Sequence, residues 1–516
     1  MDAPATLGVS ALWPQLVAFY CATLLPLVAG LPPIVAIIES TYVMTQREIW
    51  KQMARFWGKL FGIALLAWVL GSLLLAILYL ADHAPIGHHV RGLASPAVIA
   101  FFLPFVLAAG LLLWNGFRDW WSLGRIRHLL VTWAWVPLSA LAVLKVAIGY
   151  GLMDNPAGAD LDPGTLQVRI HDLPVLLLNP AAQSRFVHTL GACYLTAATL
   201  VLSVSAWYLL RDRNVRIARR SLTVAASFGL AAALSVAVLG DRTGYAQSPG
   251  QQMRIAAIAA EWHTRDAPAP FAIFGLPDSR ERATRAAVEV PWLLGLAATH
   301  SWRKPVAGMD RLEQANVARI HLGIRALTTL DTPLADPARA VVEDDLPPAG
   351  GHDLGYGLLL LRHVADPAHA DAAMIAAAAR DTEPGVPLLF WSFRAMALLG
   401  SYAIVLFACA FWLASKRRLD RRGFLRVAAC SLPVPWIAGA LGWIVSEAGR
   451  GPWLVDGLLP ITETHLGRTD ALIGAIGCAG TATLAVAGAI LIVRVVRLGP
   501  EGLGFWPMDS GRAGRY

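Results

Sequence analysis

Long apolar runs alternate with shorter polar segments along most of the chain. Nine of these runs approach the roughly 20 residues that an α-helix needs to cross a bilayer, and few charged residues interrupt them. The pattern predicts an all-α polytopic membrane protein with nine transmembrane helices. We place them at about 15–38, 57–81, 96–116, 128–151, 187–210, 220–240, 390–415, 424–447 and 470–494.

The basic residues predict the orientation of these helices. Lys and Arg gather in the connections after the first, third, fifth and seventh runs, for example Arg47 and Lys51, or Lys416 and Arg417. The short connections between them are poor in basic residues. Cytoplasmic loops of membrane proteins carry such an excess of Lys and Arg. We therefore expect the N-terminus on the periplasmic side and the C-terminus in the cytoplasm.

The sixth connection is far longer than the others and falls on the outer side by parity. Loops of this length are usually functional or form a small domain. The expected organisation is therefore six transmembrane helices in 1–240, a large periplasmic domain in 241–389, and helices seven to nine with a cytoplasmic tail in 390–516.

The composition agrees with a lipid-embedded protein. The chain is 56% hydrophobic and 15% charged, which is too apolar for a soluble globular protein. Its net charge of +8 comes with the basic connections, so it does not indicate a nucleic-acid partner. The five cysteines fall in apolar runs without the spacing of a metal finger, and we interpret them as buried free thiols.

Two residues at the outer ends of separate helices suggest a cofactor. His188 begins the fifth run and Met396 begins the seventh, so both are expected at a similar depth. Histidine and methionine form an axial pair that suits low-spin haem, and Arg394 is close enough in sequence to hold a propionate. From spacing alone, a core histidine and a packing methionine explain the same pattern.

The end of the eighth run contains a second candidate site. Glu447 and Arg450 lie three residues apart, and Gly451-Pro452 ends the helix directly after them. Charges at membrane depth are costly and usually pair with each other or with a ligand. Cys21, in the first run, is expected in the same outer half of the membrane. On its own, Cys21 is better explained as a small apolar residue of a helix.

Several ordered motifs resemble those of one known family. The motifs are Phe56-Trp-Gly-Lys-Leu-Phe61, Phe186-Val-His-Thr189, Gly240-Asp-Arg-Thr-Gly-Tyr245, Leu432-Pro-Val-Pro-Trp436 and the stretch from Gly442 to Trp453. With them, nearly the whole chain is similar to subunit I of the cytochrome bd-type quinol oxidases. The resemblance implies a haem protein of the bacterial inner membrane that is paired with a second subunit of similar fold. It also allows a small single-helix subunit.

The resemblance assigns roles to individual residues. His188 and Met396 match the axial ligands of a low-spin haem b, with Arg394 beside it. The family binds a high-spin haem b and haem d in a second region. There, Glu447 matches a carboxylate ligand, and Arg450 and Trp443 match its neighbours. In the loop that oxidises quinol, a family lysine is Arg254.

The chain departs from the family pattern at several of these sites. Cys21 stands where the family has a histidine ligand, so either a thiolate replaces that ligand or the ligand is lost. Two glutamates of the third span are Pro96 and Pro104, which cannot carry a proton. A glutamate of the quinol loop is Ala259, and Glu261 is the nearest acid that could replace it.

These departures leave three functions open. The chain is a working oxidase subunit that takes electrons from quinol and reduces oxygen at a high-spin haem site. Alternatively, it keeps only the low-spin haem b and conducts electrons, or it is a non-catalytic subunit on the same scaffold.

Overall fold

The structure is a computed structural model of the chain. It describes residues 9–80, 106, 109–110, 124–162, 167–244, 249–299, 301–330, 350–364, 366–461 and 468–502. Side chains of the first helix are described from residue 23 onwards.

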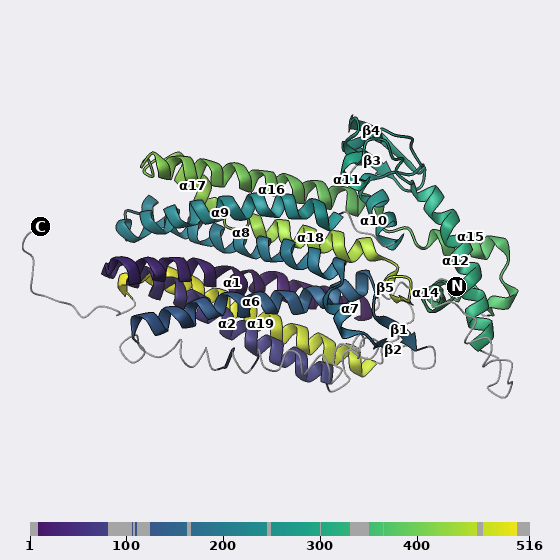
Figure 1. Cartoon of the computed structure of the whole chain (residues 1–516), viewed down its shortest axis with the longest axis horizontal. Coiled ribbons are helices and arrows are strands. Elements are labelled where there is room, and N and C mark those ends of the chain that lie inside the picture. The colour runs from purple at the N-terminus through teal and green to yellow at the C-terminus, as the bar shows by residue number, and fades with distance from the viewer. Residues whose placement is uncertain are drawn as a thin grey trace, which may run out of the picture.

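Long helices lying side by side form the body of the molecule (Figure 1). Within the described residues, eight segments are long and apolar enough to cross a membrane. They correspond to eight of the nine predicted spans. The remaining one, the third span at 96–116, falls largely on residues outside the described part of the chain. The helices are α1 (Val9–Thr45), α2 (Glu48–Leu80), α6 (Arg125–Asp154), α8 (Pro180–Leu210), α9 (Val215–Gly244), α16 (Val386–Ser415), the pair α17 (Arg422–Cys430) and α18 (Val434–Arg450), and α19 (Arg468–Gly502).

The predicted span 424–447 is divided into two helices. α17 ends at Cys430 and α18 begins at Val434, because Pro433 and Pro435 cannot donate the backbone hydrogen bonds of a continuous helix. Neighbouring helices contact the break. The Ala428 carbonyl accepts a hydrogen bond from Ser203 at 2.7 Å, and the Ser431 hydroxyl lies 2.6 Å from that of Tyr402.

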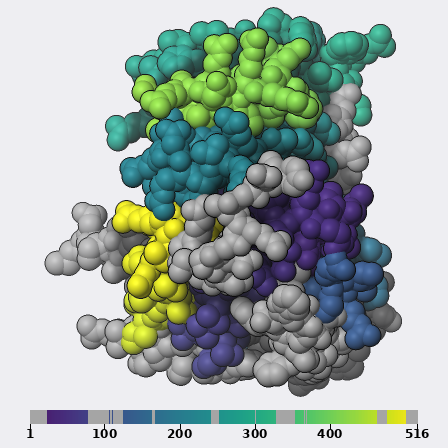
Figure 2. All heavy atoms as spheres, turned by 90° about the vertical axis from the view of Figure 1, so that its left-hand side faces the viewer, coloured from purple at the N-terminus to yellow at the C-terminus, as the bar shows by residue number. Residues whose placement is uncertain are grey.

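α8 is one of the two most buried helices of the described bundle, together with α1. It packs against α1, α6, α9, α17 and α18. Its second half is almost completely covered, because small residues such as Ala197, Ala198 and Ala206 let its neighbours approach closely. Figure 2 looks along the bundle from one end, with α16 in the upper part, α8 and α9 below it, and α2 and α19 in the lower part.

A smaller domain lies at one end of the bundle (Figure 1). We call residues 249–385 the loop domain, and we call this end of the bundle the loop-domain end. The loop domain falls within the predicted segment 241–389 and is mainly helical. Its elements are α10 (Pro249–Ala259), β3 (Phe271–Asp278), β4 (Ala283–Val290), α11 (Leu293–Thr299), α12 (Met309–Leu330), α14 (Gly350–Leu360), the 3₁₀ helix η2 (Pro367–His369) and α15 (Ala372–Arg380).

The chain is mostly helical, but the expectation of an all-α protein was incomplete. Three two-stranded antiparallel sheets lie in the connections of the described chain. In β3–β4, apolar and β-branched residues pair across the strands, as in Phe274 with Val288. The other two sheets pair β1 (Ala159–Asp162) with β2 (Gln167–Ile170) and β5 (Trp453–Val455) with β6 (Leu459–Pro460). The short helix α7 (Leu173–Leu177) follows β2.

Candidate functional site

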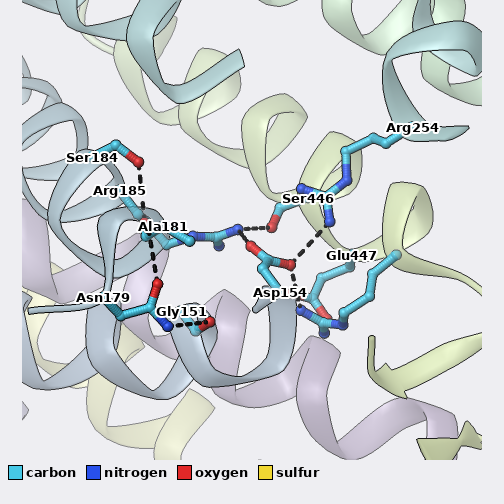
Figure 3. Close-up of polar contacts among 10 residues, drawn as sticks. Gly151, Asp154, Asn179, Ala181, Ser184, Arg185, Arg254, Ser446 and Glu447 are labelled. Carbon is cyan, nitrogen blue, oxygen red and sulfur yellow. Dashed lines mark hydrogen bonds and ion pairs between the residues drawn. The ribbon is translucent and has the colours of Figure 1, made fainter. Parts of the chain in front are cut away.

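Asp154, the last residue of α6, binds three arginines at the loop-domain end of the bundle (Figure 3). Its Oδ1 accepts a hydrogen bond from Nη2 of Arg254 at 2.9 Å and lies 3.4 Å from Nη1 of Arg450. Its Oδ2 pairs with Nη2 of Arg185. The Asp154 side chain is only 3% exposed, so these contacts are shielded from water. We call Asp154, Arg185, Arg254, Arg450 and Glu447 the arginine cluster.

The arginine cluster joins segments that are far apart in sequence. Arg185 comes from α8, Arg254 from α10 of the loop domain and Arg450 from the end of α18. Asn179 fixes the start of α8 beside Asp154, since its Oδ1 accepts from the Ala181 amide at 3.0 Å and its Nδ2 donates to the Asn155 carbonyl at 2.7 Å. The cluster therefore attaches the loop domain to the bundle.

The arginine cluster has an excess of positive charge. Two carboxylates face three guanidinium groups, which gives a net charge of +1 when all are ionised. Nη2 of Arg450 donates to Oε2 of Glu447 at 2.7 Å. Oε1 of Glu447 and Nε of Arg450 are buried and hydrogen-bond to no described residue. The sequence-predicted pair Glu447 and Arg450 is thus formed, and one carboxylate oxygen of Glu447 has no partner among the described residues.

Aromatic rings lie beside the arginine cluster. Trp443 on α18 makes an edge-to-face contact with Tyr150 on α6, with ring centroids 4.7 Å apart. The guanidinium groups of Arg185 and Arg450 stand over the Tyr150 ring, at 5.2 and 5.8 Å from its centroid. Tyr150 therefore connects Trp443 to the arginine cluster.

A cavity of about 90 Å³ opens between Arg450 and the loop domain. Gln252 and Met253 of α10, Arg319 of α12 and Tyr356 of α14 contribute to its lining. A space of this size holds a few water molecules, each of about 30 Å³. Polar and apolar side chains of the loop domain therefore face the buried Arg450 across this cavity.

The predicted axial ligands lie at similar levels on two helices, α8 and α16, that both pack against α9 and α18. His188 is eight residues into α8 and Met396 ten residues into α16, about 12 and 15 Å from the loop-domain end of each helix. A glycine faces each of them. A Cβ atom on Gly240 would lie 3.2 Å from the His188 ring, and one on Gly442 would lie 3.1 Å from the Met396 sulfur.

His188 is suited to bind a metal. Its Nδ1 is buried and makes no hydrogen bond of normal geometry to any described residue, although the Val236 backbone lies close enough to the ring to interact with it. The missing side chains of Gly240 and Gly442 keep room beside a ring nitrogen and a thioether, the two atoms that a low-spin haem needs. The residues present therefore fit a haem. Within the described part of the chain, no group of three or more His, Cys, Asp or Glu side chains gathers as a metal-ion site would require.

Arg394 lies within one turn of Met396 but binds the loop domain. Its guanidinium donates to the backbone carbonyls of Ala272, Ile258 and Phe390, at 2.9 Å to Ile258 and 2.8 Å to Phe390. Its predicted role beside a haem propionate stays a prediction. In the structure, Arg394 fixes β3 and α10 onto α16.

The two predicted quinol residues are both held in ion pairs. Arg254 belongs to the arginine cluster, and the absence of a side chain on Gly449 leaves room for it: a Cβ there would lie 2.6 Å from its Cγ. Glu261 pairs through Oε1 with Nε of Arg265 at 2.7 Å. Ala260 has a φ of 56°, and this turn after α10 directs Glu261 away from the position that Ala259 occupies.

The remaining predicted site residues lie outside the described part. Pro96 and Pro104 are not described, and Cys21 lies in α1 without a described side chain. One contact aligns α1 with α18: Nε1 of Trp436 donates to the Thr23 carbonyl at 3.2 Å. The levels of Cys21 on α1 and Glu447 on α18 can be compared from this point. By helical rise, Cys21 is about 13 Å farther than Glu447 from the loop-domain end, which places the two residues at different levels of the bundle.

Sequence reasoning missed Asp154, Arg185 and Tyr150. One signal was available: Asp154 directly follows an apolar run, where an ionisable residue is a candidate for a functional role. Its partners were not recognisable, because Arg254 and Arg450 are 100 and 296 positions away.

Comparisons with known proteins identify the family of the chain. The family described as "Cytochrome bd terminal oxidase subunit I" matches residues 13–500. The chain belongs to this family. It is 35% identical to "Cytochrome bd-II ubiquinol oxidase subunit 1" of Escherichia coli (strain K12), over 95% of this chain and 96% of that protein.

More distant members of the family show the same relationship. "Cytochrome bd ubiquinol oxidase subunit 1" of Bacillus subtilis (strain 168) is 25% identical over 85% of this chain and 81% of its own length. The solved bd oxidase from Geobacillus thermodenitrificans has a chain that matches with a TM-score of 0.68 and 18% identity, covering 95% of this chain and 99% of that one. The latter likeness supports the fold of this bd-type subunit.

Proposed function

We propose that the chain is subunit I of a quinol oxidase of the cytochrome bd type. Quinol would be oxidised at the loop domain, and oxygen would be reduced near Glu447. The observation that carries the proposal is the placement of His188 and Met396 at one level, each against a glycine. Bound haem would supply the one-electron chemistry that protein side chains lack.

The chain's own residues would hold and orient these groups. His188 and Met396 would be the axial ligands of a low-spin haem b. Glu447 has a buried oxygen available for a second site, where high-spin haem b and haem d bind by resemblance, and Arg450 holds its other oxygen. Arg254 and Glu261 would serve quinol oxidation, one from α10 and the other from the turn that follows it.

The family relationship also supports a location and partners. We propose a multi-pass protein of the bacterial inner membrane, with the loop domain and the N-terminus on the periplasmic side. The partner would be a membrane subunit similar to subunit II, and a small single-helix subunit would complete the complex. The relatives are named as subunit 1, which supports an assembly of more than one chain.

A second function is favoured by the sequence departures. With Pro96, Pro104 and Ala259 in place of acids, the chain would keep only the low-spin haem and conduct electrons. Spectra of the purified complex separate the two functions. An oxidase should show a haem that binds carbon monoxide in the reduced state. Haem b without any carbon monoxide response would overturn the oxidase and leave the electron conduit, whereas the absence of all haem would overturn both.

The pH dependence of quinol oxidation tests Glu261. Burial raises its pKa to about 7, and the neighbouring carboxylates Glu289 and Asp310 act in the same direction, against Arg265. A carboxylate accepts a proton only when it is deprotonated, so the rate should rise with pH between about 6 and 8. In Glu261→Gln, this rise should disappear and quinol turnover should fall by roughly 100-fold.

Glu383 provides a matched control for this measurement. Burial and the neighbouring Glu313 raise the pKa of Glu383 to about 8, but it lies after α15, in a different part of the loop domain. Glu383→Gln should leave the pH profile of turnover unchanged. A profile that shifts in Glu383→Gln and not in Glu261→Gln would refute the assignment to Glu261.

A further inference from the structure

Large apolar side chains are exposed along one part of the loop domain. They come from the β3–β4 hairpin, from α11 and from the segments next to α11. We call this set the apolar rim, and between 40% and 63% of each residue is exposed. Its members are Ile273, Phe274, Leu276, Val288, Trp292, Leu296 and Trp302.

The neighbouring helix α16 shows where the membrane surface lies. Apolar residues are exposed along its length, from Leu388 through Leu398 and Val405. Two exposed tryptophans, Trp391 and Trp412, mark its ends. They are 21 residues apart, or about 32 Å, which is close to the thickness of the hydrocarbon core. Tryptophan is enriched at the two membrane–water interfaces, so Trp391 indicates the interface at the loop-domain end.

The hairpin lies at the level of Trp391. The Phe274 ring makes an edge-to-face contact with the Trp391 ring, with centroids 5.3 Å apart. Arg394 holds β3 in this place, because its Nε lies 3.0 Å from the Ala272 carbonyl and 3.1 Å from that of Ile273. The depth of the hairpin is therefore fixed by α16.

α11 extends the apolar rim to a second membrane helix. It packs against α9, whose residues Leu234 and Val238 are exposed and apolar. The Gly295 amide donates to the Ala269 carbonyl at 3.2 Å, which attaches α11 to the segment before β3. Figure 1 shows the hairpin and α11 beside the end of α16, with the hairpin projecting beyond the bundle.

We propose that the apolar rim is inserted into the lipid leaflet at the loop-domain end. Lipid is the occupant because the rim continues the exposed apolar surface of α16 at the level of an interfacial tryptophan. An exposed apolar surface of this kind on a soluble domain marks an interaction site. The charged turn of the hairpin, with Arg280 and Glu281, would remain in the aqueous phase.

The proposal deepens the proposed function, on which its second part rests. Quinols are dissolved in the bilayer, so a rim inserted in the leaflet would give them a path from lipid to Arg254 and Glu261 without crossing water. The insertion itself does not depend on turnover and is tested separately.

Photo-crosslinking of the complex in lipid nanodiscs tests the insertion. Benzoylphenylalanine is introduced at Val288, and a matched variant carries it at Glu281, whose side chain is 55% exposed on the hairpin turn. Mass spectrometry should find phospholipid adducts at Val288 and none at Glu281. Equal adducts at both positions, no adducts at Val288, or a crosslink from Val288 to another protein chain would overturn the proposal.

Quinol kinetics test the path. In the double variant L276D/V288D, the KM for a quinol with a long isoprenoid tail should rise severalfold, while the KM for a short-tailed, water-soluble quinol should stay unchanged. Equal changes for both quinols would refute the path. Absence of quinol oxidation in the unsubstituted complex would instead contradict the proposed function and would leave the crosslinking result valid.

Discussion

Replacing His188 with alanine is expected to abolish the low-spin haem b spectrum. The imidazole supplies the nitrogen ligand of the proposed axial pair, and the thioether of Met396 supplies the other. Without the imidazole, iron would keep one weak sulfur ligand, and low-spin haem needs two axial ligands. The measurement is the reduced-minus-oxidised visible spectrum of the purified complex, together with its haem content.

Two further variants serve as a control and as a test of the second axial ligand. His171→Ala removes a histidine that is 57% exposed and pairs with Asp160, so its spectrum should equal that of the unchanged protein. Met396→Leu should retain the histidine ligand and shift the spectrum towards high spin. An unchanged low-spin spectrum in His188→Ala would contradict the assignment of this axial ligand.

The sequence predicted the bundle well because membrane insertion imposes a simple pattern. A spanning helix must be long and apolar, so the eight described spans could be located from hydropathy alone. The levels of His188 and Met396 followed from the same pattern and from the alternating direction of the helices. Helix ends were less accurate; α8, for example, starts at Pro180 rather than near 187, since its first turns are polar.

The arginine cluster could not be predicted, because it depends on contacts between distant segments. Arg254 was assigned to quinol and Arg450 to the high-spin haem region, and only the folded chain shows that both bind Asp154. The turn at Ala260 could not be predicted either, because no sequence pattern marks a positive φ at a non-glycine residue. Glu261 therefore could not be placed by counting along a helix.

Replacing Asp154 with alanine is expected to destabilise the protein by about 3–5 kcal/mol, the cost of leaving buried charges without their partner. Arg185, Arg254 and Arg450 would then repel one another, with Glu447 as the remaining acid of the cluster. Thermal unfolding in detergent measures the effect. Asp160→Ala is the matched control, because this acid is 64% exposed and its loss should change stability little.

A second substitution distinguishes electrostatics from packing. If repulsion causes the loss, Arg254→Gln in the Asp154→Ala background should recover part of the stability, although Arg254→Gln alone should be destabilising because it removes a contact at 2.9 Å. The loop domain should respond first, since Arg254 is its contribution to the cluster, and protease sensitivity of residues 249–385 would report its release. If the two substitutions are simply additive, Asp154 does not act through Arg254, and other contacts, such as those of Arg394 with β3 and α10, must attach the loop domain to the bundle.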